Sequence, residues 1–391
     1  MIRRTALLVA LLMVAAACQG QTERDGSLLA VVDDAGDLVL FAGDGELVRQ
    51  VTELNGQAAV FQPIWSGPES VVYVEQHTFS GDLVVTDTES NELRRVEFIT
   101  APFYVYPDPD GGDGADIVTL RNHVEGGLAA EVIHEDRTVT ALEGSFPYYF
   151  TWTADQRVVA HSGAVSLGEA YPDRLLLADS VGTFAAPGSR GNEIIFVRST
   201  GSTSLLTVLS DGELRDLASV RGPANLVVGA DRIAVRSLRT DPGGGSVEAR
   251  AQTIQAIPPD ALAVVGLDDA EVEIVATGGV LGFFWDPFGA RLLYLVVEDA
   301  DQGQLRWRVW DDGASNDYGS FGPDPSWFTS FAPFFDQYAQ SMTLWAPDGT
   351  AFAYPGTVDG ESGIWVQRLG EAEPQRISSG SWVAWGPGGS S

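Results

Sequence analysis

The feature that most constrains this chain is a short turn that recurs along almost its whole length. Three copies are clear: residues 345–349 (Trp-Ala-Pro-Asp-Gly), 285–289 (Trp-Asp-Pro-Phe-Gly) and 385–389 (Trp-Gly-Pro-Gly-Gly). Looser copies begin at Trp65 and Trp152, and three degenerate ones begin at positions 107, 185 and 228. Successive copies are 33 to 60 residues apart. Repetition at such a period indicates that one supersecondary unit is repeated along the chain.

The segments between these turns are short apolar runs typical of β-strands. A run such as Arg291–Val297 follows the turn, and a second run such as Leu305–Trp310 follows the first. Several runs end in hairpin sequences such as Asp312-Gly313. No stretch shows sustained helical periodicity. The pattern therefore predicts an all-β chain, folded as a single β-propeller of four-stranded antiparallel blades.

The two ends of the repeat predict how the ring closes. Residues 27–54 supply three strands without a first strand, while Ser381–Trp385 is a first strand with nothing after it. We expect these N-terminal strands and the C-terminal strand to complete one blade, which would leave no long exposed edge. Eight turn positions favour eight blades, and seven remain possible because the copies at 185 and 228 are weak.

The repeat also resembles a known family. A Trp-Ser/Ala-Pro-Asp-Gly turn, an apolar strand and then a strand like Gly363-Ile364-Trp365-Val366 is similar to the TolB-like, WD40-like propeller repeat. The resemblance covers nearly all of residues 27–389. It implies the propeller fold and leaves function open, since members include periplasmic binding proteins, peptidase-associated propellers and some lyases.

Charge restricts the classes of partner. The 391 residues include 54 acidic and 23 basic ones, a net charge of −31, and every basic residue other than histidine is Arg. The absence of Lys excludes a P-loop lysine and a Schiff-base lysine. Nucleic acid is excluded as a partner, because phosphate binding requires neutralising cations.

The first 18 residues have the layout of an export signal. Arg3 and Arg4 precede a short apolar stretch, and three alanines then precede Cys18, the only cysteine. This arrangement resembles a bacterial lipobox, with Ala15 where the family usually has Leu. It implies a signal peptide at 1–18, lipidation of Cys18, a polar tether at 19–26 and a propeller at 27–389. The protein would then be extracytoplasmic and held to the cell membrane by its lipid alone. Cleavage that leaves a soluble secreted protein is the alternative.

One long connection is rich in aromatic residues. The segment Gly319–Gln340 is predicted to join two blades on the rim that carries the long connections, and insertions on one rim often mark a binding face. Its rings would either bind a protein or glycan partner on the cell envelope or cover the mouth of the channel. The candidate ligand-binding residues are Phe321, Trp327, Phe328, Phe331, Phe334, Phe335 and Tyr338.

Two residue sets are candidate metal ligands. His77, His123 and His161 close equivalent strands of consecutive blades and could converge on a divalent transition metal, with Glu75, Glu125 or Glu169 adding an oxygen ligand. The alternating carboxylates of Asp108, Asp110, Asp113 and Asp116 could coordinate Ca²⁺. Strand-end histidines and turn carboxylates also occur without any metal, so the expectation is no cofactor.

The sequence shows no coherent catalytic set, so no catalytic residue is assigned. There is no Gly-x-Ser-x-Gly elbow, and the single cysteine belongs to the leader. The favoured hypothesis is a non-catalytic binding or scaffold module for a protein or glycan. The alternatives are a metal-assisted lyase or hydrolase that acts on an extracellular polymer, and a structural subunit of an envelope complex.

Overall fold

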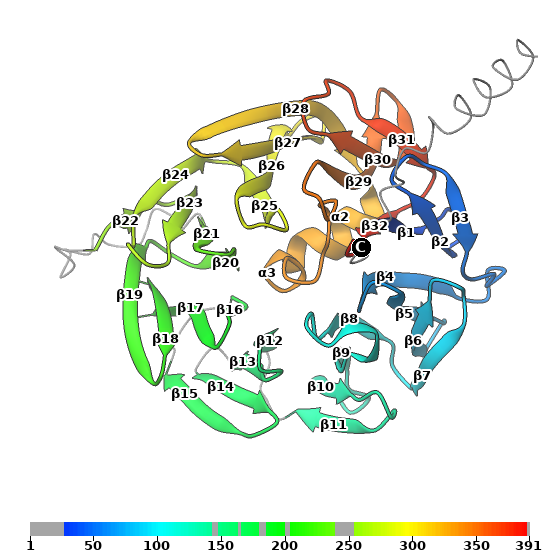
Figure 1. Cartoon of the computed structure of the whole chain (residues 1–391), viewed down its shortest axis with the longest axis horizontal. Coiled ribbons are helices and arrows are strands. Elements are labelled where there is room, and N and C mark those ends of the chain that lie inside the picture. The colour runs from blue at the N-terminus through cyan, green and yellow to red at the C-terminus, as the bar shows by residue number, and fades with distance from the viewer. Residues whose placement is uncertain are drawn as a thin grey trace, which may run out of the picture.

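The computed structural model describes residues 27–142, 148–162, 166–179, 185–199, 204–238 and 254–388. In these residues the regular structure is almost entirely β-strand, and the sheets stand around a common centre as in a β-propeller (Figure 1). The prediction is confirmed in its coarser form: the chain is nearly all β, and many of its sheets are four-stranded and antiparallel. No helix in the described part of the chain is both long and apolar enough to cross a membrane.

The first four sheets each contain four antiparallel strands. In chain order, each later sheet starts at the centre of the ring and ends at its circumference (Figure 1). The first sheet combines β1 (Leu28–Val32), β2 (Leu38–Ala42) and β3 (Leu47–Gln50) with β32 (Trp382–Trp385). The next three contain β4 (Ala59–Trp65), β5 (Ser70–Gln76), β6 (Gly81–Asp87) and β7 (Glu92–Phe98); β8 (Pro102–Pro107), β9 (Ile117–Asn122), β10 (Leu128–Ile133) and β11 (Val139–Leu142); and β12 (Tyr148–Trp152), β13 (Val158–Ser162), β14 (Ser166–Tyr171) and β15 (Leu175–Asp179).

The remaining sheets vary this plan. The fifth gains a short parallel strand at its outer edge, and the last two sets of strands form one seven-stranded sheet. The fifth sheet contains β16 (Gly188–Arg190), β17 (Glu193–Ser199), β18 (Ser204–Ser210), β19 (Glu213–Val220) and β22 (Ala256–Ile257), and the sixth contains β20 (Ala224–Val228), β21 (Arg232–Ser237), β23 (Ala261–Gly266) and β24 (Val272–Thr277). The seventh contains β25 (Val280–Trp285), β26 (Arg291–Asp299), β27 (Gln304–Asp311), β28 (Ala314–Pro323), β29 (Ala351–Val358), β30 (Glu361–Arg368) and β31 (Gln375–Ser378).

The expectation that Gly319–Gln340 is a loop without helices is wrong. The segment begins inside β28, and it continues as α2 (Pro325–Phe331), a 3₁₀ turn (Ala332–Phe334) and α3 (Phe335–Tyr338). Asp324 caps α2 by accepting hydrogen bonds from the backbone N–H groups of Ser326 and Trp327, and Pro325 occupies the first turn. Another short 3₁₀ turn lies at Gly112–Gly114.

Burial follows position within each sheet. In β5, near the centre, every residue from Ser70 to Glu75 is buried, because each face packs on a neighbouring sheet. In the outer strand β7 buried and exposed positions are mixed. The inner strands lie around the centre of the ring (Figure 1), and this arrangement positions the candidate site.

Candidate functional site

Tryptophan side chains at the recurring turn link neighbouring sheets. The indole Nε1 of Trp152 donates a hydrogen bond to the carbonyl of Tyr106, at the end of the inner strand of the preceding sheet, over 3.0 Å. Trp65, Trp285 and Trp345 make the corresponding bonds to the carbonyls of Ala384 (3.1 Å), Val227 (3.0 Å) and Phe284 (3.2 Å). A buried indole N–H is stabilised by such a partner. Four copies of the turn therefore supply a bond to the preceding inner strand as well as a turn.

A helical segment closes the channel on the side where the inner strands begin. We call residues 324–341 the plug; they lie at the centre of the ring (Figure 1). The side-chain amide of Gln337 accepts from the backbone N–H of Phe150 (3.1 Å) and donates to its carbonyl (3.2 Å). Tyr338 donates to the carbonyl of Phe103 over 2.6 Å, and Tyr104 donates to the carbonyl of Gln337 over 2.9 Å. The plug is thus bonded to two inner strands at once.

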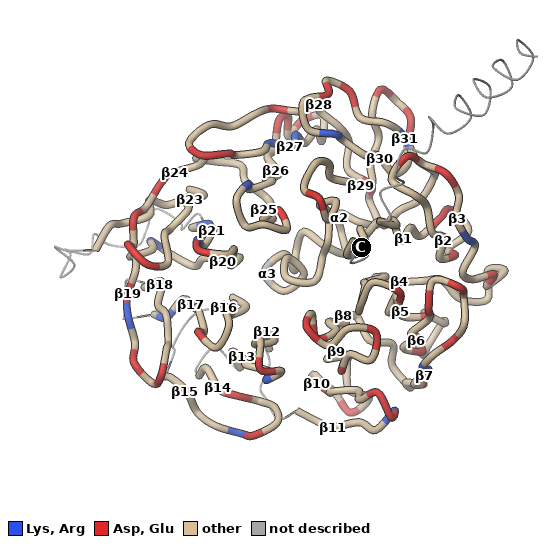
Figure 2. Tube along the Cα trace, in the orientation of Figure 1, with Lys and Arg blue, Asp and Glu red and all other residues tan. Residues whose placement is uncertain are grey.

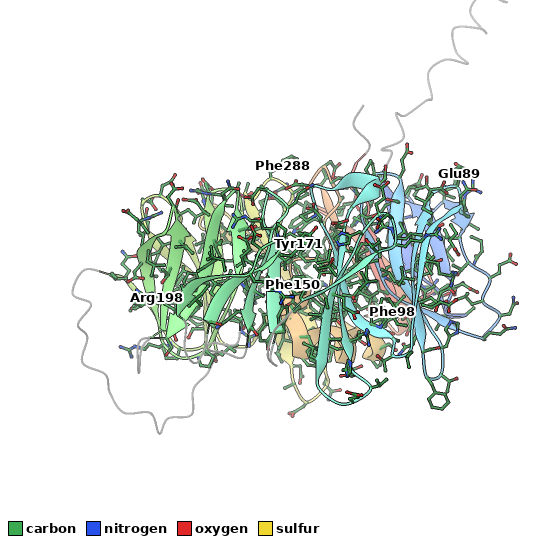
Figure 3. The ribbon with its side chains drawn as sticks, turned by 90° about the horizontal axis from the view of Figure 1, so that it is seen from below. Glu89, Phe98, Phe150, Tyr171, Arg198 and Phe288 are labelled. Carbon is green, nitrogen blue, oxygen red and sulfur yellow. The ribbon has the colours of Figure 1, made fainter. Side chains whose placement is uncertain are left out.

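The other half of the channel is an open cavity of about 620 Å³, which we call the funnel. It lies where the inner strands end, so the recurring turns surround its mouth. Figure 3 shows Phe288, from one of these turns, at that edge of the molecule. The lining combines tryptophans with glycine, proline and small hydroxyl residues, including Trp152, Trp285, Trp345, Ser66, Ser189, Gly188, Gly386, Pro109, Pro287, Pro347 and Pro387. Gln340, near the end of the plug, and Met342, just after it, also line the funnel.

The funnel lining holds one carboxylate, Asp286, among the described residues. Its side chain is fully buried and forms an ion pair with Arg291 Nε at 3.0 Å. It also accepts hydrogen bonds from the backbone N–H groups of Ala290 and Arg291. Burial raises the pKa of Tyr106, the phenol that lines the funnel, above its ordinary value. Among the described residues, the funnel lining therefore offers no unpaired charge.

The seven predicted rim aromatics divide into buried and exposed residues. Phe321, Trp327, Phe331, Phe335 and Tyr338 are buried in the central core, where Trp327 stacks on Phe331 with ring centroids 4.9 Å apart. Phe328 is partly buried, and Phe334 is 53% exposed. Four of the rings are thus core residues of the plug and Phe321 is a core residue of β28, which leaves Phe334 as the exposed ring of the set.

The three histidines do not converge. His77 and His123 follow the ends of β5 and β9, whereas His161 lies within β13 and is buried. Among the described residues, the one group of three possible ligand atoms within 4.8 Å of one another is Glu75, His77 and Asp82. The second strand of each sheet lies away from the channel, which keeps the histidines of successive sheets apart.

Both carboxylates of this trio already pair with one arginine. Arg95 Nη1 lies 2.7 Å from both Glu75 Oε2 and Asp82 Oδ2. Hydrogen bonding to Glu75 raises the pKa of Arg95 further above its ordinary value. Other sheets carry similar pairs across their strands: Arg121 with Glu131 at 2.7 Å, Arg157 with Glu169 at 3.0 Å and Arg198 with Asp216 at 2.8 Å. The trio therefore belongs to a series of structural ion pairs.

The acidic loop points its carboxylates in different directions. Asp113 Oδ1 accepts from Ser70 Oγ of the preceding sheet at 2.8 Å, while Asp116 Oδ2 lies 2.8 Å from His134 Nδ1. Asp108 is buried and accepts from the backbone N–H of Asp110 at 3.1 Å. The structure does not gather the four carboxylates of this loop around one point. Sequence spacing could not show that two of them bond to partners elsewhere.

An acidic groove lies beside the funnel. It has a volume of about 520 Å³ and shares Trp152 with the funnel. Its carboxylates are Asp108, Asp116, Asp155, Glu169 and Asp173. Burial, with the nearby carboxylates of Asp110 and Asp116, raises the pKa of Asp108. Arg157 is paired with both Asp155 (2.8 Å) and Glu169.

The sequence did not predict the funnel as a site, although the recurring turns that line it are evident in the sequence. The long connections predicted a binding face on the opposite rim, whereas the open cavity lies among the short turns. The signal that identifies the plug is a helical one: Trp327, Phe331, Phe335 and Tyr338 follow one another at intervals of four, four and three residues. Cys18, the leader 1–18, the tether 19–26 and Gly389 lie outside the described residues.

Comparison with known proteins identifies the fold. No family model and no curated protein matches the chain. A crystal structure of the eukaryotic initiation factor matches with a TM-score of 0.52 at 10% identity, over 92% of this chain and 98% of that one. A structure from a study of two prolyl endopeptidases has a TM-score of 0.52 at 12% identity, over 84% of this chain and half (50%) of that one. TolB from Acinetobacter baumannii has a TM-score of 0.41 at 14% identity, over 80% of this chain and 67% of that one. At these identities the first two likenesses show a shared fold, and the radial antiparallel sheets show that this fold is a β-propeller.

Proposed function

We propose that the protein is an extracytoplasmic β-propeller, anchored by a lipid on Cys18, that binds a partner without catalysing a reaction. The observation that carries the proposal is the funnel: an open cavity of about 620 Å³ in which the only carboxylate among the described residues is paired with Arg291. A binding site needs such a cavity. An acid–base enzyme would need an available proton donor or acceptor in it.

The lining favours a protein partner over a glycan. Glycan binding uses exposed aromatic faces, but four of the lining tryptophans are at most 7% exposed and Trp285 is partly buried; the four are Trp65, Trp152, Trp345 and Trp385. Much of the remaining wall is glycine, proline and serine, which exposes backbone polar groups. We infer that the funnel takes an extended, uncharged peptide segment.

We also propose eight blades. The seven-stranded sheet separates naturally into two, because β28 and β29 share only the pairs Gly322–Thr357 and Pro323–Gly356. An isolated bridge between Trp345 and Phe352 supplies the inner edge of the last blade. The pairing of β1 with β32 over four residue pairs supports closure by the two ends of the chain.

The test uses two variants of the segment that forms the plug and leads into the funnel. Gln340 lines the funnel, whereas Phe334 is exposed outside it, so Gln340→Trp fills the cavity and Phe334→Trp is the matched control. Peptides selected from a displayed random library on the wild-type protein should bind wild type and Phe334→Trp, and should lose at least about tenfold in affinity on Gln340→Trp, because filling a pocket excludes its ligand. Equal binding to all three proteins would contradict the funnel as the site.

A metal-assisted lyase or hydrolase is the second candidate, and it rests on the cluster Glu75, His77 and Asp82. Elemental analysis of residues 19–391 purified without chelator tests it. One equivalent of a transition metal that is lost in His77→Ala would support the enzyme. Without that metal the enzyme has no support, because Arg95 already occupies the space between the two carboxylates as their ion-pair partner.

A further inference from the structure

The described chain begins and ends beside the mouth of the funnel. The backbone N–H of Gly386, which lines the funnel, donates to the carbonyl of Leu28 over 2.7 Å. Ser27, the first described residue, is buried. Any tether that joins residue 27 therefore leaves the propeller on the funnel face.

The length of that tether restricts how the propeller can face a membrane. Nine residue steps separate Cys18 from Ser27, which span at most about 30 Å when fully extended. To place the opposite rim on the membrane, the tether would have to cross β2 and β3 and then run down the side of the ring. Two strand spacings of about 4.8 Å and one strand length of about 20 Å would together take up the entire length of the tether.

Charge prevents the funnel face, which the tether holds near the membrane, from pressing against the lipid. Acidic residues line the circumference of the ring (Figure 2), while the funnel mouth is formed by prolines, glycines and tryptophans. With a net charge of −31, the body is repelled by anionic lipids, an effect that fades beyond about 8 Å at physiological salt. A gap that a peptide segment can enter therefore remains between the funnel and the bilayer.

From this geometry we propose that the funnel faces the membrane and captures an uncharged, extended segment of another membrane-anchored protein. The inference rests on the lipid anchor of the proposed function. The inference adds that the partner arrives from the membrane side. It also implies that the opposite rim, which carries Phe79, faces away from the membrane. Phe79 is 89% exposed on the turn between β5 and β6, on the rim opposite Phe288.

The lipidated full-length protein can be labelled with a fluorophore at one chosen position. Because Cys18 is the only cysteine and would be consumed by the lipid, a single introduced cysteine can carry a fluorophore. Phe288→Cys labels the funnel face, where the side chain is 60% exposed, and Phe79→Cys labels the opposite rim. Both proteins are placed on phosphatidylcholine vesicles with and without phosphatidylglycerol, with an energy acceptor on a lipid headgroup.

We expect energy transfer from position 288 to be at least twice that from position 79 on both kinds of vesicle. Insertion of twenty Gly/Ser residues after Gly26 should remove the difference, because a long flexible tether no longer fixes the face. Equal transfer from the two positions with the native tether would overturn the orientation alone. Failure of the wild-type protein to bind vesicles more than Cys18→Ala would overturn the lipid anchor and this inference together.

The route of the partner is tested on the same vesicles. A peptide selected on the funnel is coupled to a lipid headgroup through a short spacer and presented beside the anchored propeller. Binding should be at least tenfold tighter than that of the free peptide, because both partners are confined to one surface, and it should be lost in Gln340→Trp. No gain over the free peptide would overturn arrival from the membrane side.

Discussion

At the scale of single residues, four indole N–H groups of the recurring turn, those of Trp65, Trp152, Trp285 and Trp345, each bond to the preceding inner strand. Trp152→Phe removes the 3.0 Å bond to the carbonyl of Tyr106, whereas the Nε1 of Trp385 has no hydrogen-bond partner among the described residues. Trp385→Phe is therefore a matched control that loses a similar ring volume without losing a bond. We expect Trp152→Phe to cost about 1 kcal/mol more than Trp385→Phe, measured by urea unfolding. Equal losses would show that ring packing alone selects tryptophan at this turn.

A second residue-scale prediction concerns pH. Burial raises the folded-state pKa of Asp108, so ionisation costs the folded protein more than the unfolded one. The contribution that protonated Asp108 makes to folding stability is fully present below its unfolded-state pKa of about 3.9. That contribution is lost as the pH rises through the higher folded-state pKa. Asp108→Asn keeps the acceptor for the N–H of Asp110 and removes the charge. We expect its Tm to exceed that of wild type by about 2 °C at pH 7, and the gain to vanish below about pH 3.5.

Asp155, in the same acidic groove, supplies a control of opposite sign. Partial burial works to raise its pKa, but hydrogen bonds from Thr153 and Arg157 outweigh it and lower the pKa. The stability from these bonds is present above the unfolded pKa and is lost as pH falls through the folded pKa. Asp155→Asn should therefore lower Tm at pH 7 and become neutral in acid. A destabilised Asp108→Asn at pH 7 would show that Asp108 is stabilised as an anion.

At the scale of elements, the plug depends on one side chain. Gln337→Leu leaves the buried N–H and carbonyl of Phe150 without their partners, at a cost of about 2–3 kcal/mol. Phe334→Ser, at an exposed position of the same segment, should change stability by less than about 0.5 kcal/mol. Hydrogen exchange should show faster exchange of the Phe150 amide in Gln337→Leu only. Unchanged protection would mean that the inner strands hold this amide without the plug.

The elements differ in how far the sequence could predict them. The ends of β4, β12 and β25 fall on Trp65, Trp152 and Trp285, because a repeated turn signal is local and survives tertiary packing. The plug was missed because prolines and a high aromatic content suggested a loop, although the four-residue spacing of its rings is helical. The link from Arg95 on β7 to Glu75 on β5 could not be predicted, since it depends on strand register across the sheet. For the same reason the sequence placed histidines in a common site that the structure does not form.

At the scale of the whole molecule, the proposed closure predicts that β32 is indispensable although it is the last strand. Its residues Trp382, Val383, Ala384 and Trp385 are all buried, and the carbonyl of Ala384 accepts from the indole of Trp65. Removal of residues 381–391 would expose the edge of β1 and leave that indole unpaired. We expect a loss of more than about 5 kcal/mol, or of cooperative unfolding altogether. Removal of 389–391 alone, which spares β32, is the control and should have no effect.

A circular permutant distinguishes closure from a simple need for more chain. Phe352 bridges to Trp345 seven positions earlier, since 352 − 345 = 7. Joining Gly388 directly to Gly26 places Leu29 seven positions after Trp385, because residues 386, 387, 388, 26, 27, 28 and 29 then follow one another, and Leu29 is the partner of Trp385 in the pairing of β1 with β32. The permutant that begins at Ser381 and ends at Gly380 would thus form its closing turn with the spacing of the last blade. We expect it to unfold cooperatively within about 2 kcal/mol of the native order, because the permuted ends lie at a surface connection. If the permutant stays as unstable as the truncated chain, β32 stabilises the protein in some way other than by closing the ring.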